Sequence, residues 1–318
     1  CPGCVANGIS RQVANEIFDD MSSFASYAFN KSHAAAHALV AYQTAYLKCH
    51  YMRPFFAALL TSVLENTDKV IEYTTECQRL GIRVLPPDIN KSGLGFTVDG
   101  EDIRFGLLAL KNVGRNLIQG VIEKRRSGLY TSLYDFCTKL YGREMNRRAV
   151  ESFIKSGAFD SFGDSRKAML EGLESILKSV EGENRRNLEG QISLFGGEEA
   201  KQMNRYDLPK VQEYSHGELL KMEKEISGLY LSGHPLDAYR DKIARFASAN
   251  ISSLSGEDAE QMDNRVVVLV CAVVRTKYLT TRSDKMMAFV TVEDLTGTME
   301  LLVFPRVLTD CCSAIYDN

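Results

Sequence analysis

The sequence predicts a multidomain α+β protein that is mainly helical and is followed by a small, truncated β-barrel. Apolar residues recur at three- and four-residue spacing over residues 11–80 and again over 108–170, which is the period of amphipathic helices. Residues 265–304 contain instead short β-branched and apolar runs between turn-forming residues. A chain of 318 residues with 45% hydrophobic composition can form two or three domains, each with its own core.

Residues 1–105 are predicted to form helices followed by short extended pieces. Residues 11–80 are rich in Ala, Leu, Glu and Lys and contain a single proline, Pro54. Gly81 is expected to end the last helix, because glycine commonly follows a helix C-terminus. Residues 82–107 place apolar residues between turn signals such as Asp99-Gly100, as short strands do.

Residues 106–170 are predicted to form short helices separated by glycines, as in an array of helical hairpins. Residues 171–215 are predicted to be a flexible connector, because the helical period is lost from about residue 181 while Glu, Asn, Arg, Gln and Gly accumulate. Residues 216–260 form a predicted helical linker around a turn at 232–235.

Residues 261–318 are predicted to begin an oligonucleotide-binding barrel. Three strands are expected, at 265–275, 287–293 and 299–304. Such a barrel has five strands, so the chain stops before the barrel is complete. The chain also opens at Cys1 without a methionine, and we therefore expect both ends to be cuts in a longer chain.

Composition excludes several classes of protein. No apolar run approaches the roughly 20 residues that cross a bilayer, and no signal-peptide pattern is present, so a soluble cytoplasmic protein without membrane contact is expected. The eight cysteines form no dense framework, which favours reduced thiols. Cys1 and Cys4 form the one CxxC, and because no second ligand pair follows at finger spacing we expect no zinc.

Charge is distributed unevenly along the chain. The formal net charge is −3, but residues 111–155 carry ten Lys or Arg against four acids, a local charge of +6 that leaves −9 on the rest. Clustering of this kind is typical of a surface that contacts a phosphate backbone, although a solvated helix face produces weaker versions of it.

Residues 30–33 form a candidate anion site. Asn30 or Ser32 can cap the helix that the following alanines predict, and Lys31 and His33 add cationic groups to the positive end of the helix dipole. A triphosphate would suit such a site. The alternative is an ordinary capped helix start with Lys31 in solvent.

Two kinds of metal site are not indicated. His33 and His37 share a helical face, but Ala34 stands where a zinc protease motif has its glutamate, and no third ligand is evident. No Asp-x-Asp pair suits two-metal phosphoryl transfer. We therefore assign no metal ligand and no catalytic residue to this chain.

Residues 110–114 have the form of a helix-hairpin-helix turn, which presents backbone N–H groups to a DNA phosphate and needs positive φ at its hairpin positions. Gly114 is expected to supply one such position, and Asn112 stands where a first glycine is usual. Phosphate binding is favoured over a plain helical hairpin because the basic segment surrounds the turn.

A second predicted helical pair, 130–140 and 146–154, has arginines between its helices, for which solvated surface is an equal alternative. The candidate DNA-binding residues of the two hairpins are Lys111, Asn112, Gly114, Arg115, Lys124, Arg125, Arg126, Arg143, Arg147 and Arg148.

One apolar island interrupts the connector, and it consists of Gln191, Ile192, Ser193, Leu194 and Phe195. Apolar residues isolated in a flexible segment are often anchors that fill pockets on a partner protein. Local packing against the parent domain is the alternative.

Several motifs follow one another along essentially the whole chain: FNKSHAA (29–35), YQTAYLK (42–48), LPPDIN (85–90), NRR (146–148), SGAFD (156–160) and GLYLSGHP (228–235). In this order they closely resemble the C family of DNA polymerases, the alpha subunits of bacterial replicative DNA polymerase III. Ala28 and His37 depart from this pattern, because the family usually has Gly and Tyr there.

The resemblance implies that residues 1–105 belong to the fingers, 106–170 to a tandem helix-hairpin-helix, 191–195 to an internal clamp-binding motif and 261–318 to a truncated oligonucleotide-binding domain. It implies DNA-directed DNA synthesis in chromosome replication, with Mg²⁺ held by carboxylates outside this chain. The partners would be primer–template DNA, deoxynucleoside triphosphates contacted by Asn30, Lys31, Ser32 and His33, a sliding clamp and other replisome subunits. A non-enzymatic DNA-binding adaptor is the alternative.

Overall fold

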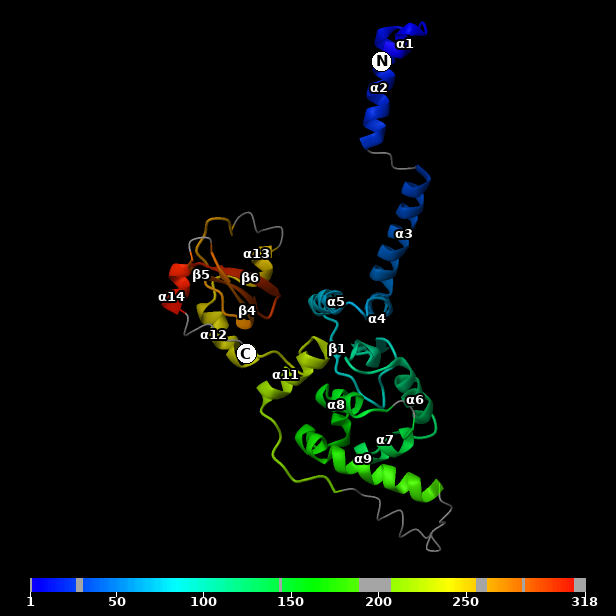
Figure 1. Cartoon of the computed structure of the whole chain (residues 1–318), viewed down its shortest axis with the longest axis vertical. Coiled ribbons are helices and arrows are strands. Elements are labelled where there is room, and N and C mark those ends of the chain that lie inside the picture. The colour runs from blue at the N-terminus through cyan, green and yellow to red at the C-terminus, as the bar shows by residue number, and fades with distance from the viewer. Residues whose placement is uncertain are drawn as a thin grey trace. The chain divides into compact units, whose positions relative to one another are not determined.

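A computed structural model describes residues 2–26, 31–142, 145–188, 207–255, 262–281 and 284–311. The chain divides into two compact units, Cys1–Phe55 and Phe56–Asn318. The predicted class, mainly helical with a small β segment, is confirmed (Figure 1). No helix in the described ranges is long and apolar enough to span a membrane.

The first unit is built from helices α1 (Pro2–Ala6), α2 (Arg11–Ser26) and α3 (Lys31–His50), and α4 (Met52–Ser62) begins in it. Helix α3 carries large apolar side chains at the surface, where Leu39, Val40 and Tyr42 are more than half exposed. Among the described residues of this unit, the only buried side chain is Ala14.

The second unit starts with α5 (Thr67–Arg79) and a three-stranded sheet of β1 (Val84–Leu85), β2 (Thr97–Asp99) and β3 (Asp102–Arg104). Strand β3 lies in the centre, parallel to β1 and antiparallel to β2. Gly81 has φ +78 directly after α5, which confirms the predicted helix end. The short strands expected between residues 82 and 107 are therefore present.

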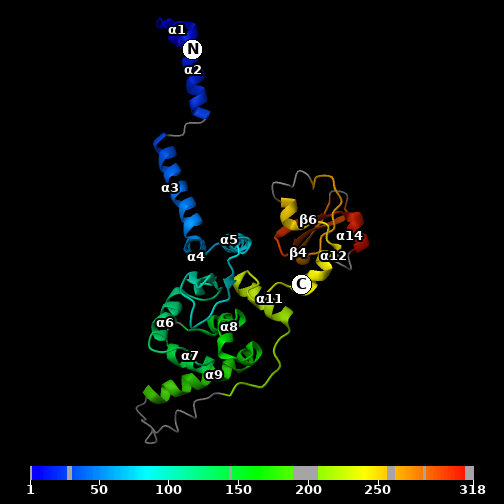
Figure 2. The same ribbon diagram turned by 180° about the vertical axis from the view of Figure 1, so that it is seen from behind.

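The hairpin domain follows and contains η1 (Leu107–Ala109), α6 (Arg115–Arg125), α7 (Leu133–Leu140), α8 (Arg147–Lys155), η2 (Asp160–Phe162) and α9 (Arg166–Leu188) (Figure 2). Three fully buried rings form its centre, with Phe136 at 4.9 Å from Phe159 and 5.8 Å from Phe153 between centroids, both edge-on. The Tyr130 ring packs on this cluster and donates its hydroxyl to Val121 O at 2.9 Å.

Helix α9 continues to Leu188, so residues 171–188 are not part of a flexible connector as predicted. The helix is held because its inner face packs on the hairpin domain, where Met169, Leu173, Ile176 and Val180 are buried. Its residues 181–187 have no apolar side chain, so the sequence shows no helical period there.

The chain then forms α11 (His216–Ser227), η3 (Asp237–Tyr239), α12 (Arg240–Phe246) and α13 (Ile251–Ser255), as expected for a helical linker. Ser215 and Glu218 form a reciprocal capping box at the start of α11. Gly228 ends this helix in the left-handed conformation, with φ +79.

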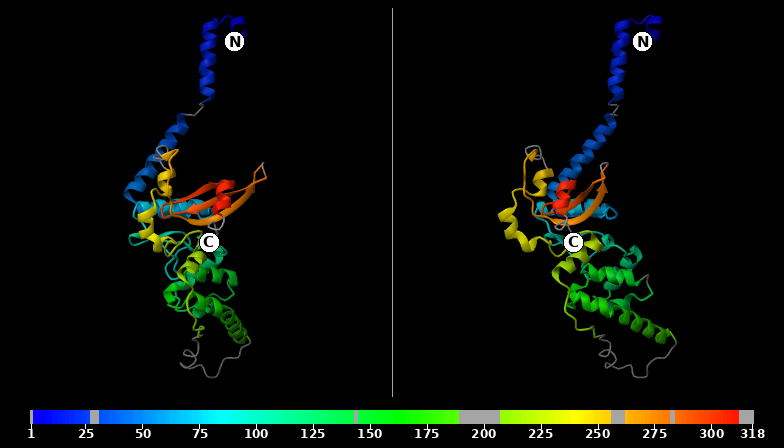
Figure 3. Two further views of the ribbon diagram at one scale, coloured as in Figure 1. Left: turned by 90° about the vertical axis from the view of Figure 1, so that its left-hand side faces the viewer. Right: turned by 60° about the vertical axis from the view of Figure 1, so that its left-hand side comes forward.

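The last part is an antiparallel sheet in the order β4 (Ala272–Thr280), β5 (Met286–Glu293) and β6 (Thr298–Val303), followed by α14 (Pro305–Cys311). Ala288, Val290 and Val292 of β5 form a core with Ile251 of α13 and Leu308 of α14. Figure 3 shows α14 against this twisted sheet. The second and third predicted strands are confirmed within one residue at each end.

The first predicted strand, 265–275, is displaced, because β4 begins only at Ala272. Val266 is fully exposed and Val268 is half exposed, so the β-branched run before Ala272 has no sheet to pack on. Strand propensity mostly measures such packing, which explains the error.

Candidate nucleic-acid interface

The first hairpin turn connects η1 to α6 through residues 110–114. Asn112 has φ +64, which confirms the left-handed position predicted there. Gly114 is the N-cap of α6 with φ −83, so the prediction that it supplies a positive φ is wrong. The turn needs only one left-handed residue, and asparagine provides it.

Contacts from two sides hold this turn in place. The Asn112 side-chain amide donates to Ser152 Oγ of α8 at 3.4 Å. The Lys111 backbone N–H donates to Ile226 O at the end of α11, at 3.0 Å. The first turn of α6 is exposed at Gly114, Arg115 and Asn116, and its N-terminus is therefore accessible to an anion.

The described part of the second hairpin turn, between α7 and α8, also has a left-handed residue ahead of a helix start. Gly142 has φ +79, and Asn146 caps α8 by accepting from Ala149 N at 2.9 Å. Both helices that follow a turn, α6 and α8, start with an arginine, Arg115 and Arg147. Arg143, another predicted DNA-binding residue, lies outside the described residues.

Three of the predicted DNA-binding cations are engaged within the protein. Lys111 donates through Nζ to Glu225 O at 2.8 Å. Arg125 donates to the carbonyl oxygens of Ile89 and Ser92, both at 2.9 Å, and burial lowers its pKa. Arg147 pairs with Glu151 at 2.7 Å, and this carboxylate raises its pKa. These three residues stabilise the fold.

The remaining predicted cations are available for phosphate. Within the described ranges, Arg115, Arg126 and Arg148 are exposed and have no hydrogen bond or ion pair from their side chains. Lys124 is half-buried and likewise lacks such a partner there. The structure thus reduces the candidate set to side chains that can bind DNA without first detaching from the protein.

The outer face of the β4–β6 sheet is a second candidate surface. Alternation puts Phe289 opposite the buried Ala288 and Val290, and the register pairs Phe289 with the exposed Lys277 and Leu302. Sequence reasoning did not assign these residues, because their pairing depends on strand register. An aromatic ring beside cations is the usual platform for single-stranded nucleic acid.

The predicted nucleotide-contacting residues lie at the start of α3. Asn30 is outside the described residues, and Lys31 is the first residue of the helix. Ser32 and His33 occupy its first turn and are exposed. His37, which shares a helical face with His33, is exposed one turn later. No group of three or more His, Cys, Asp or Glu in the described part of the chain could hold a metal ion.

The predicted clamp-binding residues, Gln191, Ile192, Ser193, Leu194 and Phe195, lie outside the described residues. The chain after them returns to the hairpin domain, where Glu213 accepts from the Arg166 and Lys167 backbone N–H groups at 2.6 and 3.1 Å. Glu213 therefore caps the N-terminus of α9. Sequence reasoning missed this cap, because its residues are 46 and 47 positions apart.

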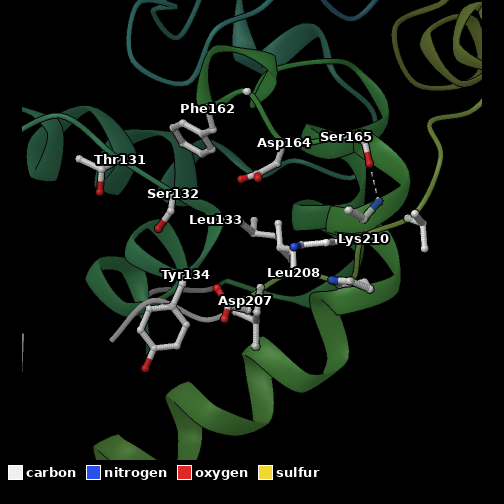
Figure 4. Close-up of a pocket in the computed structure, with 15 residues that line it drawn as sticks. Thr131, Ser132, Leu133, Tyr134, Phe162, Asp164, Ser165, Asp207, Leu208 and Lys210 are labelled. Atoms are coloured by element: carbon white, nitrogen blue, oxygen red, sulfur yellow. Dashed lines mark hydrogen bonds between the residues drawn. The ribbon is translucent and has the colours of Figure 1, made fainter. Parts of the chain in front are cut away.

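A cavity of about 530 Å³ lies between the start of α7, the start of α9 and residues 207–211 (Figure 4). Both helix starts are capped from within, by Ser132 accepting from Asp135 N and by Ser165 accepting from Ala168 N. None of the candidate DNA-binding residues is among those that line it. The cavity is separate from the hairpin turns.

The sequence was compared with protein-family models and with known proteins. A helix-hairpin-helix motif model matches residues 81–169. The DNA polymerase III alpha subunit of Thermus aquaticus is 41% identical over 96% of this chain, and that of Escherichia coli strain K12 is 36% identical over 96%. Over nearly its whole length, the chain is similar to one part of the DNA polymerase III alpha subunits. It spans about a quarter of these relatives' length, 24% and 26%.

Asn112→Gly should keep the duplex affinity of the chain and lose only the hydrogen bond to Ser152 Oγ, since glycine adopts positive φ without strain. Asn112→Val should lower the free energy of unfolding by about 1–2 kcal/mol, because a β-branched residue is strained there. Urea unfolding measures the difference. Gly114→Ala is the control and should be tolerated, because φ is negative and no atom lies within 4 Å of the added methyl group. A fully stable Asn112→Val variant would contradict this account.

Proposed function

We propose that the chain is the part of a bacterial DNA-directed DNA polymerase that holds primer–template DNA and contacts the incoming nucleotide. The two hairpin turns carry the proposal: in the described part of the chain, each has a left-handed residue and an exposed helix start, with one unpaired arginine there, Arg115 at α6 and Arg148 at α8. Backbone N–H groups at such helix starts bind phosphate oxygens without reading sequence. This suits an enzyme that copies any template.

Single-stranded template is proposed to lie on the outer face of the β4–β6 sheet. Phe289 offers a ring for base stacking, and Lys277 and Arg275 on the neighbouring strand offer charge for the backbone. Duplex and single strand would then contact different elements of the same unit.

The synthesis reaction itself requires groups from outside the described residues. Mg²⁺ would activate the primer hydroxyl in the full-length enzyme. The described residues do not fit this ion, because they contain no cluster of three or more potential ligands. We therefore assign this chain the binding of DNA and nucleotide.

DNA binding is tested by changing Arg115, Arg126 and Arg148 to Gln together. The slope of log affinity against log salt for duplex DNA should become shallower by about 0.9 for each phosphate that is no longer neutralised, about 2.7 in all. The control, Lys178→Gln with Arg185→Gln and Lys242→Gln, removes the same charge from α9 and α12 and should leave the slope unchanged. Equal slopes for both variants would place the DNA elsewhere.

Asn30, Lys31, Ser32 and His33 are proposed to contact the triphosphate. Because Lys31 is the first residue of α3, its charge adds to the helix dipole. In the full-length polymerase, Lys31→Ala should cost about 1.5–3 kcal/mol of transition-state binding, roughly ten- to a hundredfold in kcat/KM. Lys31→Arg should restore part of this. Arg11→Ala, at the start of α2, is the control. Equal kcat/KM values for the two alanine variants in steady-state kinetics would exclude the contact.

Docking of a sliding clamp through residues 191–195 is proposed on the resemblance of this segment to a clamp-binding motif. Leu194→Ala with Phe195→Ala should abolish clamp binding in a calorimetric titration and leave duplex affinity intact, because apolar anchors act through a pocket on the partner. Gln202→Ala with Met203→Ala changes the same connector and should bind normally. Retained clamp binding by the first variant would remove the proposal.

A further inference from the structure

Helix α11 contacts two different parts of the second unit through adjacent residues. Glu223 and Lys224 follow one another, so their side chains leave the helix about 100° apart. Glu223 points to the hairpin domain, where it contacts Arg166, and Lys224 contacts Glu293 at the end of β5. Figures 1 and 2 both show α11 beside α8.

The contact with the hairpin domain is a fully satisfied buried network. Glu223 is completely buried and accepts from Arg166 Nη1 and from the Leu231 and Ser232 backbone N–H groups, all at 2.9 Å. Arg166 also donates to both oxygens of Asp160, at 2.9 and 2.6 Å. One carboxylate therefore fixes both α11 and the turn after it to the hairpin domain.

The contact with the sheet is built in the same way. Glu293 is 8% exposed and accepts from Lys224 Nζ and from the Tyr230 hydroxyl, both at 2.6 Å. Burial, and next the Glu293 carboxylate, raise the Tyr230 pKa, so the phenol keeps its proton and remains a donor. The Lys224 ammonium also lies 4.3 Å from the Tyr230 ring centroid.

The C-terminus of α11 touches the first hairpin turn directly. Lys111 donates to the carbonyl oxygens of Glu225 and Ile226, and Lys155 of α8 pairs with the Glu225 carboxylate at 3.1 Å. A continuous chain of polar contacts thus runs from the hairpin turn through α11 to the end of β5. Removing one partner from its buried pair, Arg166 and Glu223, would leave an uncompensated buried charge, which is costly.

We propose that α11 and residues 228–232 form a coupler that holds the hairpin domain and the β4–β6 sheet in a fixed register, with Glu223 and Glu293 as its two anchors. One consequence of this coupler rests on the proposed function. Because the hairpins are proposed to bind duplex and the sheet to bind single strand, the coupler makes the two parts bind one DNA molecule together. Linked sites of fixed spacing bind a matching ligand far more tightly than either site alone.

The coupler is tested with Tyr230→Phe and Glu293→Gln in one 318-residue chain. Both changes conserve the shape of the side chain, so the variant should fold. A Glu223 variant is not used, because it would leave Arg166 buried without its partner. In scanning calorimetry the wild type should unfold its hairpin domain and sheet in one transition. The double variant should show a separate sheet transition at least about 5 °C lower. Glu171→Gln, the same chemical change at an exposed site of α9, should behave as wild type.

DNA binding supplies the second measurement. The wild type should bind a duplex with a single-stranded extension at least about tenfold more tightly than the blunt duplex. The double variant should lose most of this ratio while keeping its affinity for the blunt duplex. Two independent transitions in the wild type, an unchanged calorimetric profile in the variant, or an unchanged junction-to-duplex ratio would each overturn the coupler. Failure of the arginine test above would instead remove duplex binding by the hairpins, and calorimetry would still decide the coupler.

Discussion

The buried ion pair between Arg166 and Glu223 is the interaction on which the arrangement of the second unit depends. Charges this far from water are tolerated only where every donor and acceptor has a partner. Arg166 meets this condition with Glu223, both oxygens of Asp160 and the Lys155 carbonyl oxygen. Gly157 is required beside it, because its φ is +80 and a Cβ there would lie 2.3 Å from Arg166 Nη2. One side chain thus joins α8, η2, α9 and α11.

The same need for internal partners determines which cations of the basic segment remain free at the surface. A basic segment is not equivalent to a basic surface, because part of its charge is used to close the fold. Lys111 caps the C-terminus of α11, and Arg125 ties α6 to the loop that carries Ile89 and Ser92. Of the cations left over, Arg115 and Arg148 lie at the helix starts that follow the hairpin turns, and Lys124 and Arg126 lie at the end of α6. These groups do not have to leave an internal partner to bind an anion.

The two candidate surfaces of the second unit offer different kinds of interaction. The hairpin turns offer backbone donors and point charges, which bind the regular phosphates of a duplex. The sheet offers an aromatic ring at a fixed strand register, which suits unstacked bases. The buried acids of α11 and β5 connect the elements that carry them.

The sequence by itself determined what depends on near neighbours. Helical periods, the left-handed turn at Asn112 and the later two strands were predicted correctly, because spacing and local backbone preference set them. Gly114 was misjudged because glycine permits positive φ without requiring it. The tertiary structure alone decided that α9 runs to Leu188, that β4 starts at Ala272, and which cations remain free. It also brought Arg166 to Glu223 across 57 positions, a pairing that no local pattern encodes because it arises from packing.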